Sequence, residues 1–369
     1  MLKYPIYYPY LRGNEKKYVN DCLDTKWISS QGKYVSLFEE AVCNYTGVKH
    51  AISVFNGTAA LELALLSIGI KAGDEILVPD FTYIASANAV THVGAIPVLV
   101  DVAPDDWNID CKKIEKHIGP KTKGIMTTDI YGMPANYQRI QEIAHKHNLL
   151  IIEDAAESFG AVYNKKKAGN FGDIATFSFF GNKTITTGEG GMVLTNNDQC
   201  AVMAKKIRNQ GNSDTIRYYH DMLGYNFRMT NIQAAIGLAQ IEQIDDILEK
   251  KRNICNWYKS SLSSLLTFQN EAARIRSSYW MVGFLCQDQK EKQQLAEYLM
   301  SRGIDSRPFF FPIHRMPFYT PQEHPVSISL SEKGLCVPSY PSLTKEDINY
   351  ICEEIKKCIT AYRKHTQHK

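Results

Sequence analysis

The chain has 369 residues, of which 44% are hydrophobic and 22% charged, and its formal net charge is +3; this is ordinary for a soluble enzyme and allows one large domain with a smaller one. Like charges cluster only in the Lys/His-rich tail after Tyr362, so nucleic acid and a membrane surface are not expected as partners. Nine Cys without CxxC pairs or zinc-like spacing, no secretory signal and no apolar run near the roughly 20 residues of a membrane span indicate a cytoplasmic protein without a metal site.

Short apolar runs alternate with helical segments in the first half of the chain. Asp110 and Asn136 have the side chains that cap helices, so two helices are predicted to start there. Alternation at this spacing predicts βαβ units around a mostly parallel sheet, an α/β fold. The predicted strands are 51–55, 75–78, 97–100, 124–127 and 149–152, and the other predicted helices are 15–24, 58–68 and 83–93.

The alternation weakens after Thr195. We predict a helix over 197–208, a polar loop over 212–225 and one long helix from 230 to 250 or beyond. Thr344, with Asp347 three residues on, is predicted to cap a last amphipathic helix from 345 to about 362. The change of pattern places a domain boundary near residue 245. The predicted domains are 1–245, large and including the N-terminal segment, and 246–369, smaller and also α/β.

The segment Asn56-Gly57-Thr58 joins a predicted strand to a helix. Free N–H groups in the first helical turn attract an anion, and Gly57 would let a phosphate approach the backbone closely. A plain capped helix explains the same local sequence equally well. The Gly-Lys-Ser/Thr ending of a Walker A loop is absent, and no GxGxxG follows the first strand, which disfavours a nicotinamide dinucleotide fold.

Two further residues combine into a possible reaction centre. Asp154 follows four apolar residues; its usual fate would be a helix cap or a salt bridge, but its charge could also keep a ring nitrogen protonated. Lys183 lies in a polar, Gly-flanked loop. Such a Lys is usually solvated, yet in a closed site that lowers its pKa it forms Schiff bases with carbonyls.

Three more residues belong with this pair by their order and type. Glu157 would lie near the same ring as Asp154, and Ser178 could donate its hydroxyl to a phosphate. Tyr83 could stack on a planar cofactor, although Tyr at a strand-to-helix turn is more often core. Together these residues predict a cofactor pocket that holds an aldehyde within reach of Lys183.

Several segments of the chain, taken together, resemble the DegT/StrS group of sugar-nucleotide aminotransferases. The resemblance covers about Tyr8 to Ile355. Residues 27–32 and 178–191 are most similar to the perosamine synthase branch of that group. The segments that carry the overall resemblance are Asn56-Gly57-Thr58-Ala59-Ala60, Pro79-Asp80-Phe81-Thr82-Tyr83, Glu153-Asp154-Ala155-Ala156-Glu157-Ser158 and Gly224-Tyr225-Asn226-Phe227-Arg228.

The resemblance implies pyridoxal 5'-phosphate as cofactor, the fold type I architecture of its transferases, and a homodimer. Lys183 matches the Schiff-base lysine of the family, and Asp154 matches the acid paired with the pyridine nitrogen. Glu157 stands where many members have Gln, which leaves its hydrogen bond to the cofactor open because a carboxylate only accepts. The other implied contacts are Gly57, Thr58 and Ser178 at the phosphate, Tyr83 on the ring, and Asn226 reaching the phosphate from the partner subunit.

The resemblance also implies the reaction, a transfer of the amino group of L-glutamate to a nucleotide-linked 4-keto-6-deoxyhexose, leaving 2-oxoglutarate. The implied product is GDP-perosamine, with UDP- or dTDP-linked sugars as the alternative. Ser29, Ser30, Arg228 and His314 are candidates for holding the nucleotide sugar, although His314 is equally explained as a surface loop residue. A sugar dehydratase is disfavoured because that branch has His where this chain has Lys183. A non-catalytic relative would be expected to lack Lys183 or Asp154, and both are present.

Overall fold

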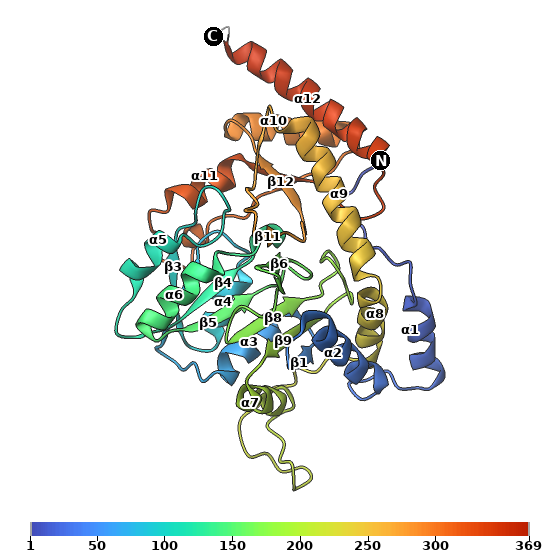
Figure 1. Ribbon diagram of the computed structural model, residues 1–369, viewed down its shortest axis with the longest axis vertical. Helices are drawn as coiled ribbons and strands as arrows, with labels where there is room; N and C mark the ends of the chain where they lie inside the picture. Colours follow the sequence, from blue (N-terminus) through green and yellow to red (C-terminus); the bar gives the residue numbers. More distant parts are fainter. Residues whose placement is uncertain (1, 368–369) are drawn as a thin grey trace.

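A computed structural model describes residues 2–367 and contains a central seven-stranded sheet (Figure 1). All neighbouring strands are parallel except β9, which runs antiparallel to both β1 and β8. The predicted α/β fold with a mostly parallel sheet is therefore confirmed. In order across the sheet the strands are β1 (His50–Val54), β9 (Gly191–Thr195), β8 (Ile174–Ser178), β5 (Leu150–Asp154), β4 (Thr122–Thr128), β2 (Glu75–Pro79) and β3 (Ile96–Val100).

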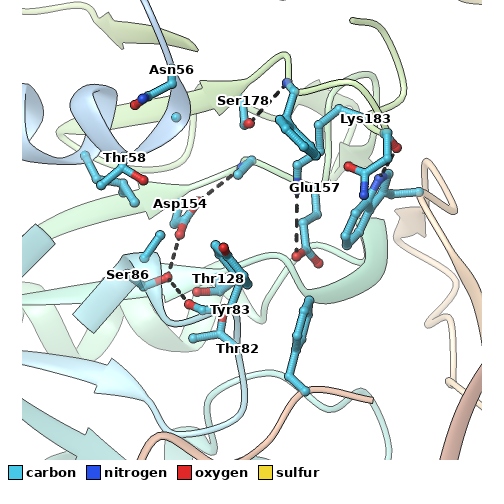
Figure 2. Close-up of a pocket in the computed structure, with 18 of the residues that line it drawn as sticks. Asn56, Thr58, Thr82, Tyr83, Ser86, Thr128, Asp154, Glu157, Ser178 and Lys183 are labelled. Carbon is cyan, nitrogen blue, oxygen red and sulfur yellow. Dashed lines mark hydrogen bonds and ion pairs between the residues drawn. The ribbon is translucent and has the colours of Figure 1, made fainter. Parts of the chain in front are cut away.

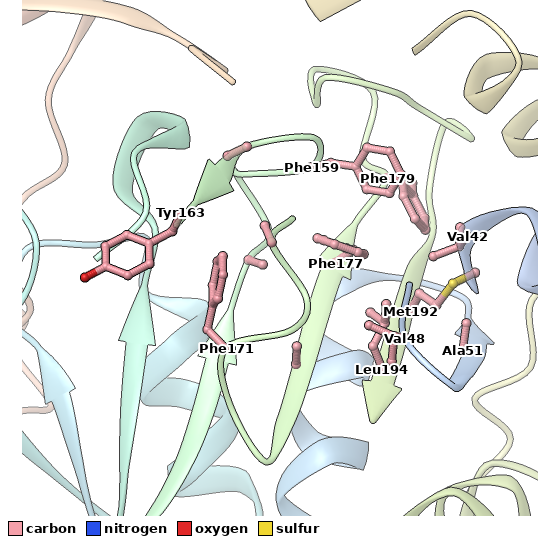
Figure 3. Packing of buried hydrophobic residues seen from close by; sticks show 14 of the residues in the cluster. Val42, Val48, Ala51, Phe159, Tyr163, Phe171, Phe177, Phe179, Met192 and Leu194 are labelled. Carbon is pink, nitrogen blue, oxygen red and sulfur yellow. The ribbon is translucent and has the colours of Figure 1, made fainter. Parts of the chain in front are cut away.

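Both faces of this sheet are covered by helices, because its strands are apolar on both sides. On β9, Met192 and Leu194 pack on one face and Val193 on the other, as the two-residue period of a strand requires. Phe177 and Phe179 share the first face with Val42 (Figure 3). That face carries α2 (Lys33–Thr46) and α6 (Tyr137–His147), and the opposite face carries α3 (Gly57–Ser67), α4 (Ala85–His92) and α7 (Asp198–Arg208).

Side-chain caps fix where several of these helices begin. Asn56 accepts a hydrogen bond from the Ala59 N–H at the start of α3, and Asn136 caps α6 in the same way. Asp110 caps the short helix α5 (Cys111–Ile114), as predicted. Helices α1 (Glu15–Asp24) and α8 (Asn231–Ile241) lie outside α2.

A second, antiparallel sheet is formed by the C-terminal part of the chain. Its strands, in spatial order, are β10 (Thr267–Phe268), β12 (Val282–Leu285), β14 (Gly334–Val337) and β13 (Arg307–Pro308). Its apolar core also includes Tyr4, so the N-terminal segment reaches this part of the molecule. The helices associated with it are α9 (Ile244–Leu262), α10 (Gln289–Ser301), α11 (Pro325–Lys333) and α12 (Lys345–Gln367). The domain boundary near residue 245 stays a prediction.

The helices depart from prediction in one place and agree in another. The single helix predicted from residue 230 is wrong, because α8 ends at Ile241 and α9 begins at Ile244. Between the two helices the side chain of Glu242 accepts hydrogen bonds from Asn14 and Tyr18. No local sequence pattern predicts this tertiary contact. The predicted cap of α12 is confirmed, since the Asp347 N–H donates to the Thr344 hydroxyl. Within residues 2–367 no helix combines the length and the apolar character needed to cross a membrane.

A small three-stranded sheet lies between the two larger ones. It pairs β6 (Val162–Tyr163) with both β7 (Lys166–Lys167) and β11 (Ile275–Arg276). The β11 strand belongs to the C-terminal part of the chain, so this pairing ties that part to the loop that follows β5. The tie helps to hold residues near 280 over the carboxyl ends of the central strands.

Candidate active site

A cavity of about 440 Å³ opens where β5 and β8 end and α3 begins (Figure 2). Ligands bind at the carboxyl ends of parallel strands because the helices and loops that follow diverge there. The cavity has three chemically distinct parts, namely a carboxylate, an amine and the N-terminus of a helix. Seven predicted site residues line it together: Gly57, Thr58, Tyr83, Asp154, Glu157, Ser178 and Lys183.

Asp154 is the last residue of β5, and its carboxylate points into the cavity. One oxygen accepts a hydrogen bond from the Ser86 hydroxyl at 2.7 Å, and the other accepts one from the Ala156 N–H at 3.1 Å. Burial raises the pKa of Asp154, and these hydrogen bonds and the charge of Lys183 oppose the rise. A positive group placed against this carboxylate would therefore be strongly attracted to it.

Glu153, the preceding acid on β5, points to the other face because successive strand residues alternate. Its two oxygens accept hydrogen bonds from the N–H groups of Gly169 and Phe171, at 2.5 and 2.8 Å. This carboxylate is fully engaged in holding a loop. Of the two neighbouring acids, Asp154 alone is available to a ligand in the cavity.

Lys183 enters the cavity from the loop after β8, on the far side from Asp154. Its Nζ lies 3.8 Å from the ring centroid of Trp280 and 3.9 Å from Oε1 of Glu157. The loop is fixed by two hydrogen bonds, from the Tyr7 hydroxyl to the carbonyl of Lys183 and from the Trp280 indole to the carbonyl of Asn182. Burial lowers the pKa of Lys183, although the charges of Glu157 and Asp154 act in the opposite direction. A neutral, nucleophilic amine is thereby favoured.

Glu157 lines the cavity beside the amine, together with Asp154. Its second oxygen, Oε2, accepts a hydrogen bond from the Tyr131 N–H at 2.6 Å. Burial raises the pKa of Glu157, and the charge of Lys183 opposes that effect. The carboxyl group can therefore exist in its protonated form near neutral pH, in which it could donate a hydrogen bond.

The N-terminus of α3 forms the third part of the cavity. Gly57 and Thr58 are the first residues of the helix, so their N–H groups have no partner within it. A Cβ atom on Gly57 would lie 2.8 Å from the Cβ of Ser178, so only Gly fits against that strand. The Ser178 hydroxyl lies close to Gly57, since its Oγ would be 2.9 Å from such a Cβ atom, and Figure 2 shows the Ser178 side chain at the cavity. This arrangement suits a phosphate group.

Aromatic rings and an Arg from distant parts of the chain complete the walls. The Tyr83 side chain is 58% exposed, and its ring centroid lies 5.9 Å from that of Phe310. Trp280, Arg307 and Phe310 come from the C-terminal part of the chain. Sequence analysis missed these three residues, and no local signal could have found them because they reach the cavity only through the tertiary fold.

The other predicted site residues do not line this cavity. Ser30 and Arg228 line a separate cavity of about 520 Å³. The Ser29 carbonyl accepts a hydrogen bond from the Asn231 N–H at 2.6 Å, and the exposed Asn226 accepts one from Arg228 at 3.0 Å. A single chain therefore does not bring these four residues to Lys183.

His314 is also outside the cavity. It is 3% exposed, and its imidazole Nδ1 lies 2.7 Å from Oδ2 of Asp80. The alternative of a surface loop residue is wrong, because the ring is buried against a carboxylate. Its candidacy for holding the nucleotide sugar receives no support from this position.

The residues of the cavity fit pyridoxal 5'-phosphate. The α3 N-terminus with Ser178 would hold the phosphate, Asp154 the ring nitrogen, and Lys183 the aldehyde. The close approach of Gly57 to Ser178 is the specific observation behind this fit, because it brings the Ser178 hydroxyl and the first turn of α3 together at the cavity. Tyr83 and the Trp280 ring offer apolar surfaces to a planar group.

Comparisons with known proteins identify the family of the chain. Residues 9–356 match the model of the DegT/DnrJ/EryC1/StrS aminotransferase family. The GDP-perosamine synthase of Escherichia coli O157:H7 is 47% identical over 96% of this chain and 99% of its own, and that of Vibrio cholerae is 42% identical over 95% and 98%. The PMP-form structure of the putative sugar aminotransferase Spr1654 from Streptococcus pneumoniae has a TM-score of 0.93 at 25% identity, covering 98% of this chain and 99% of that one.

Proposed function

This chain belongs to the DegT/DnrJ/EryC1/StrS aminotransferase family, and on that premise we propose that it transfers the amino group of L-glutamate to GDP-4-keto-6-deoxymannose, giving GDP-perosamine. The chain is a pyridoxal phosphate-dependent sugar-nucleotide aminotransferase of fold type I. The observation that carries the choice of substrate is 42–47% identity, over nearly the full chain, to proteins named GDP-perosamine synthase. UDP- and dTDP-linked sugars are the less favoured alternative.

Different residues of the cavity bind different parts of the cofactor. Gly57, Thr58 and Ser178 hold the phosphate of the cofactor through backbone N–H groups and a hydroxyl, where the α3 dipole favours negative charge. Tyr83 covers one face of the ring. The Asp154 carboxylate, kept in place by Ser86, holds the proton on the ring nitrogen.

Lys183 carries out the proton transfers. Pyridoxal phosphate, when bound, supplies an aldehyde and a ring that delocalises carbanion charge. Burial lowers the pKa of Lys183, so its Nζ can accept the proton from the α-carbon of glutamate at neutral pH. In the second half of the reaction the proton transfer runs in the opposite direction, and Nζ donates a proton to C4 of the sugar. The Trp280 ring lies beneath the amine and excludes water from that side.

The proposal includes a homodimer whose active sites are shared. Asn226 is exposed and outside the cavity of its own chain, as expected if it serves the partner's phosphate site. The segment between α7 and α8 projects from the body of the molecule (Figure 1). It carries Tyr218 and Leu223, which are 85% and 83% exposed. Large apolar side chains at such exposure are a typical feature of a surface that another chain covers.

A substrate comparison tests this function. The enzyme is offered glutamate with GDP-, UDP- or dTDP-linked 4-keto-6-deoxyhexoses, and 2-oxoglutarate formation is measured. We expect turnover with the GDP sugar to exceed the others by at least about tenfold in kcat/KM, as a difference of about 1.4 kcal/mol in transition-state binding gives. Preference for a UDP or dTDP sugar would change the substrate assignment. No turnover with any of them would refute the activity, and Lys183→Ala supplies the blank.

A further inference from the structure

Asp80, His314 and His324 form a buried polar cluster outside the cavity. Their exposed fractions are 0%, 3% and 5%. Oδ2 of Asp80 lies 2.7 Å from Nδ1 of His314 and 3.1 Å from Nδ1 of His324, and Oδ1 accepts a hydrogen bond from the His314 N–H at 2.9 Å. Placing three such groups away from water is costly unless they satisfy one another, so the cluster needs an explanation that the catalytic cavity does not provide.

The cluster joins two distant parts of the chain beside the cavity. Asp80 directly follows β2, and Thr82 and Tyr83, two and three residues on, line the cavity. His314 and His324 belong to the segment 309–325. Phe310, the second residue of this segment, lines the cavity. Backbone bonding reinforces the junction, since the Ile313 N–H donates to the Asp80 carbonyl at 2.9 Å.

Aromatic packing continues from this junction to the cavity wall. Phe81 contacts Phe309 and Phe310, with ring centroids 5.9 and 6.4 Å apart, and Phe310 in turn contacts Tyr83. Phe309 is held tightly, because a Cβ atom on Gly334 would lie 1.9 Å from its ring. A displacement at Asp80 would therefore be passed to the residues that face the cofactor.

We propose that Asp80, His314 and His324 act as a positioning clamp, fastening the segment 309–325 to the end of β2 and thereby fixing Tyr83 and Phe310 against the cofactor. The proposal rests on the cofactor role of the cavity given above. None of the three side chains lines the cavity, so they act through Tyr83 and Phe310.

The contact between Asp80 and His314 has the geometry of a hydrogen bond and not of two metal ligands, whereas the 3.1 Å contact of His324 Nδ1 with the same carboxylate is close without meeting hydrogen-bond geometry. Burial raises the pKa of Asp80, but contacts with His324 and His314 outweigh it, so the pKa is lowered and Asp80 is an ionised acceptor. The ligand atoms of the three residues lie within 4.8 Å of one another, which a cation could also use. However, two ligands held about 2.0–2.1 Å from one tetrahedral ion lie roughly 3.3 Å apart. The 2.7 Å separation is that of a charge-assisted hydrogen bond.

Asp101 provides a matched control. It directly follows the neighbouring strand β3, is 2% exposed, and also binds the C-terminal part of the chain. Its Oδ1 accepts hydrogen bonds from the N–H and hydroxyl of Ser327, at 3.0 and 2.8 Å. It has no cavity-lining neighbour in sequence. A purely structural effect of losing a buried carboxylate should therefore be common to both sites.

The test compares Asp80→Asn with Asp101→Asn in the full-length protein. Both are expected to lower Tm. Only Asp80→Asn is expected to raise the Kd for pyridoxal phosphate, measured by equilibrium titration of the apoenzyme, by about tenfold, the size of a lost aromatic contact. If Asp80→Asn does not fold, His324→Asn, which leaves the 2.7 Å contact, should raise the same Kd by a smaller factor.

Three outcomes would overturn the clamp. One is an unchanged Kd in a folded Asp80 or His324 variant, and another is an equal rise of Kd in Asp101→Asn. The third is a stoichiometric metal in the purified wild-type protein that is lost in Asp80→Asn, which would make the cluster a metal site. If the wild-type apoenzyme binds no pyridoxal phosphate, the proposed function fails instead, so the two failures are distinguishable.

Discussion

Lys183 and Lys251 are both largely shielded from solvent, and their surroundings differ in the feature that allows chemistry. Lys251 on α9 is 1% exposed, and its Nζ donates a hydrogen bond to the Ser339 carbonyl at 3.0 Å. Lys183 has a side chain that is 13% exposed and faces a cavity lined by Asp154, Glu157 and Glu189. Burial lowers the pKa of both amines. A lowered pKa alone therefore does not identify a reactive lysine.

The difference lies in what each amine can reach. The Lys251 amine is occupied by a backbone carbonyl, and the cavity at Lys183 does not extend to it. The Trp280 ring lies beneath the Lys183 amine, and Oε1 of Glu157 lies 3.9 Å from Nζ, which is too far for a hydrogen bond. The amine is therefore close to both neighbours but is not engaged in a hydrogen bond with either. Three substitutions test this difference between the two lysines.

The largest effect is expected from Lys183→Ala. Removing the amine removes both covalent capture and proton transfer, so turnover should fall by about 10⁴-fold or more. The fold should persist, because the side chain makes no hydrogen bond of its own. Single-turnover kinetics measures the loss, and circular dichroism checks the fold. Lys251→Met is the matched control, expected to keep near wild-type turnover; comparable activity losses in both variants would erase the distinction.

Glu157→Gln should have an intermediate effect, on the pH dependence of Lys183. The charge of Glu157 raises the pKa of Lys183, so removing it lowers that pKa and increases the neutral fraction of the amine at pH 7. Capture of pyridoxal phosphate by the apoenzyme should become several-fold faster at pH 7, with its midpoint moved to lower pH. Stopped-flow absorbance gives the rates. Glu189→Gln, in the same cavity but not among the groups that shift Lys183, should leave the profile in place.

The smallest effect is on stability, from Lys251→Met. Burial lowers the pKa of Lys251 to about 7 from a usual value of 10.5, so between those values the unfolded chain holds more protons and wild-type stability rises with pH. At pH 6 the amine is charged in the folded protein, so the folded state bears the full free-energy cost of burying that charge. There the variant should be about 1 kcal/mol more stable, even after leaving the Ser339 carbonyl unpaired.

That advantage should shrink or reverse by pH 9, where the wild-type amine is neutral when folded. Urea unfolding of both proteins at pH 6 and pH 9 measures the difference between them, in which the other titrating groups cancel. A difference that does not change with pH would contradict the assignment of Lys251 as an amine buried at a cost.

The sequence by itself was sufficient for features that depend on neighbours a few residues away. The apolar run ending at Asp154, and the caps at Asp110 and Asn136, were visible because strand burial and helix capping involve residues close in the chain. The order of Gly57, Asp154 and Lys183 also sufficed to predict one cavity, since the carboxyl ends of parallel strands meet at one edge of the sheet.

Only the tertiary structure decided what surrounds these residues. Trp280 and Phe310 reach the cavity from loops next to the strands of the second sheet, and His314 is buried against Asp80, 234 positions away in the chain. The interruption between α8 and α9 likewise coincides with contacts from Asn14 and Tyr18. Contacts of such separation leave no period or spacing in the sequence, because their geometry is set by how whole elements pack and not by the local backbone.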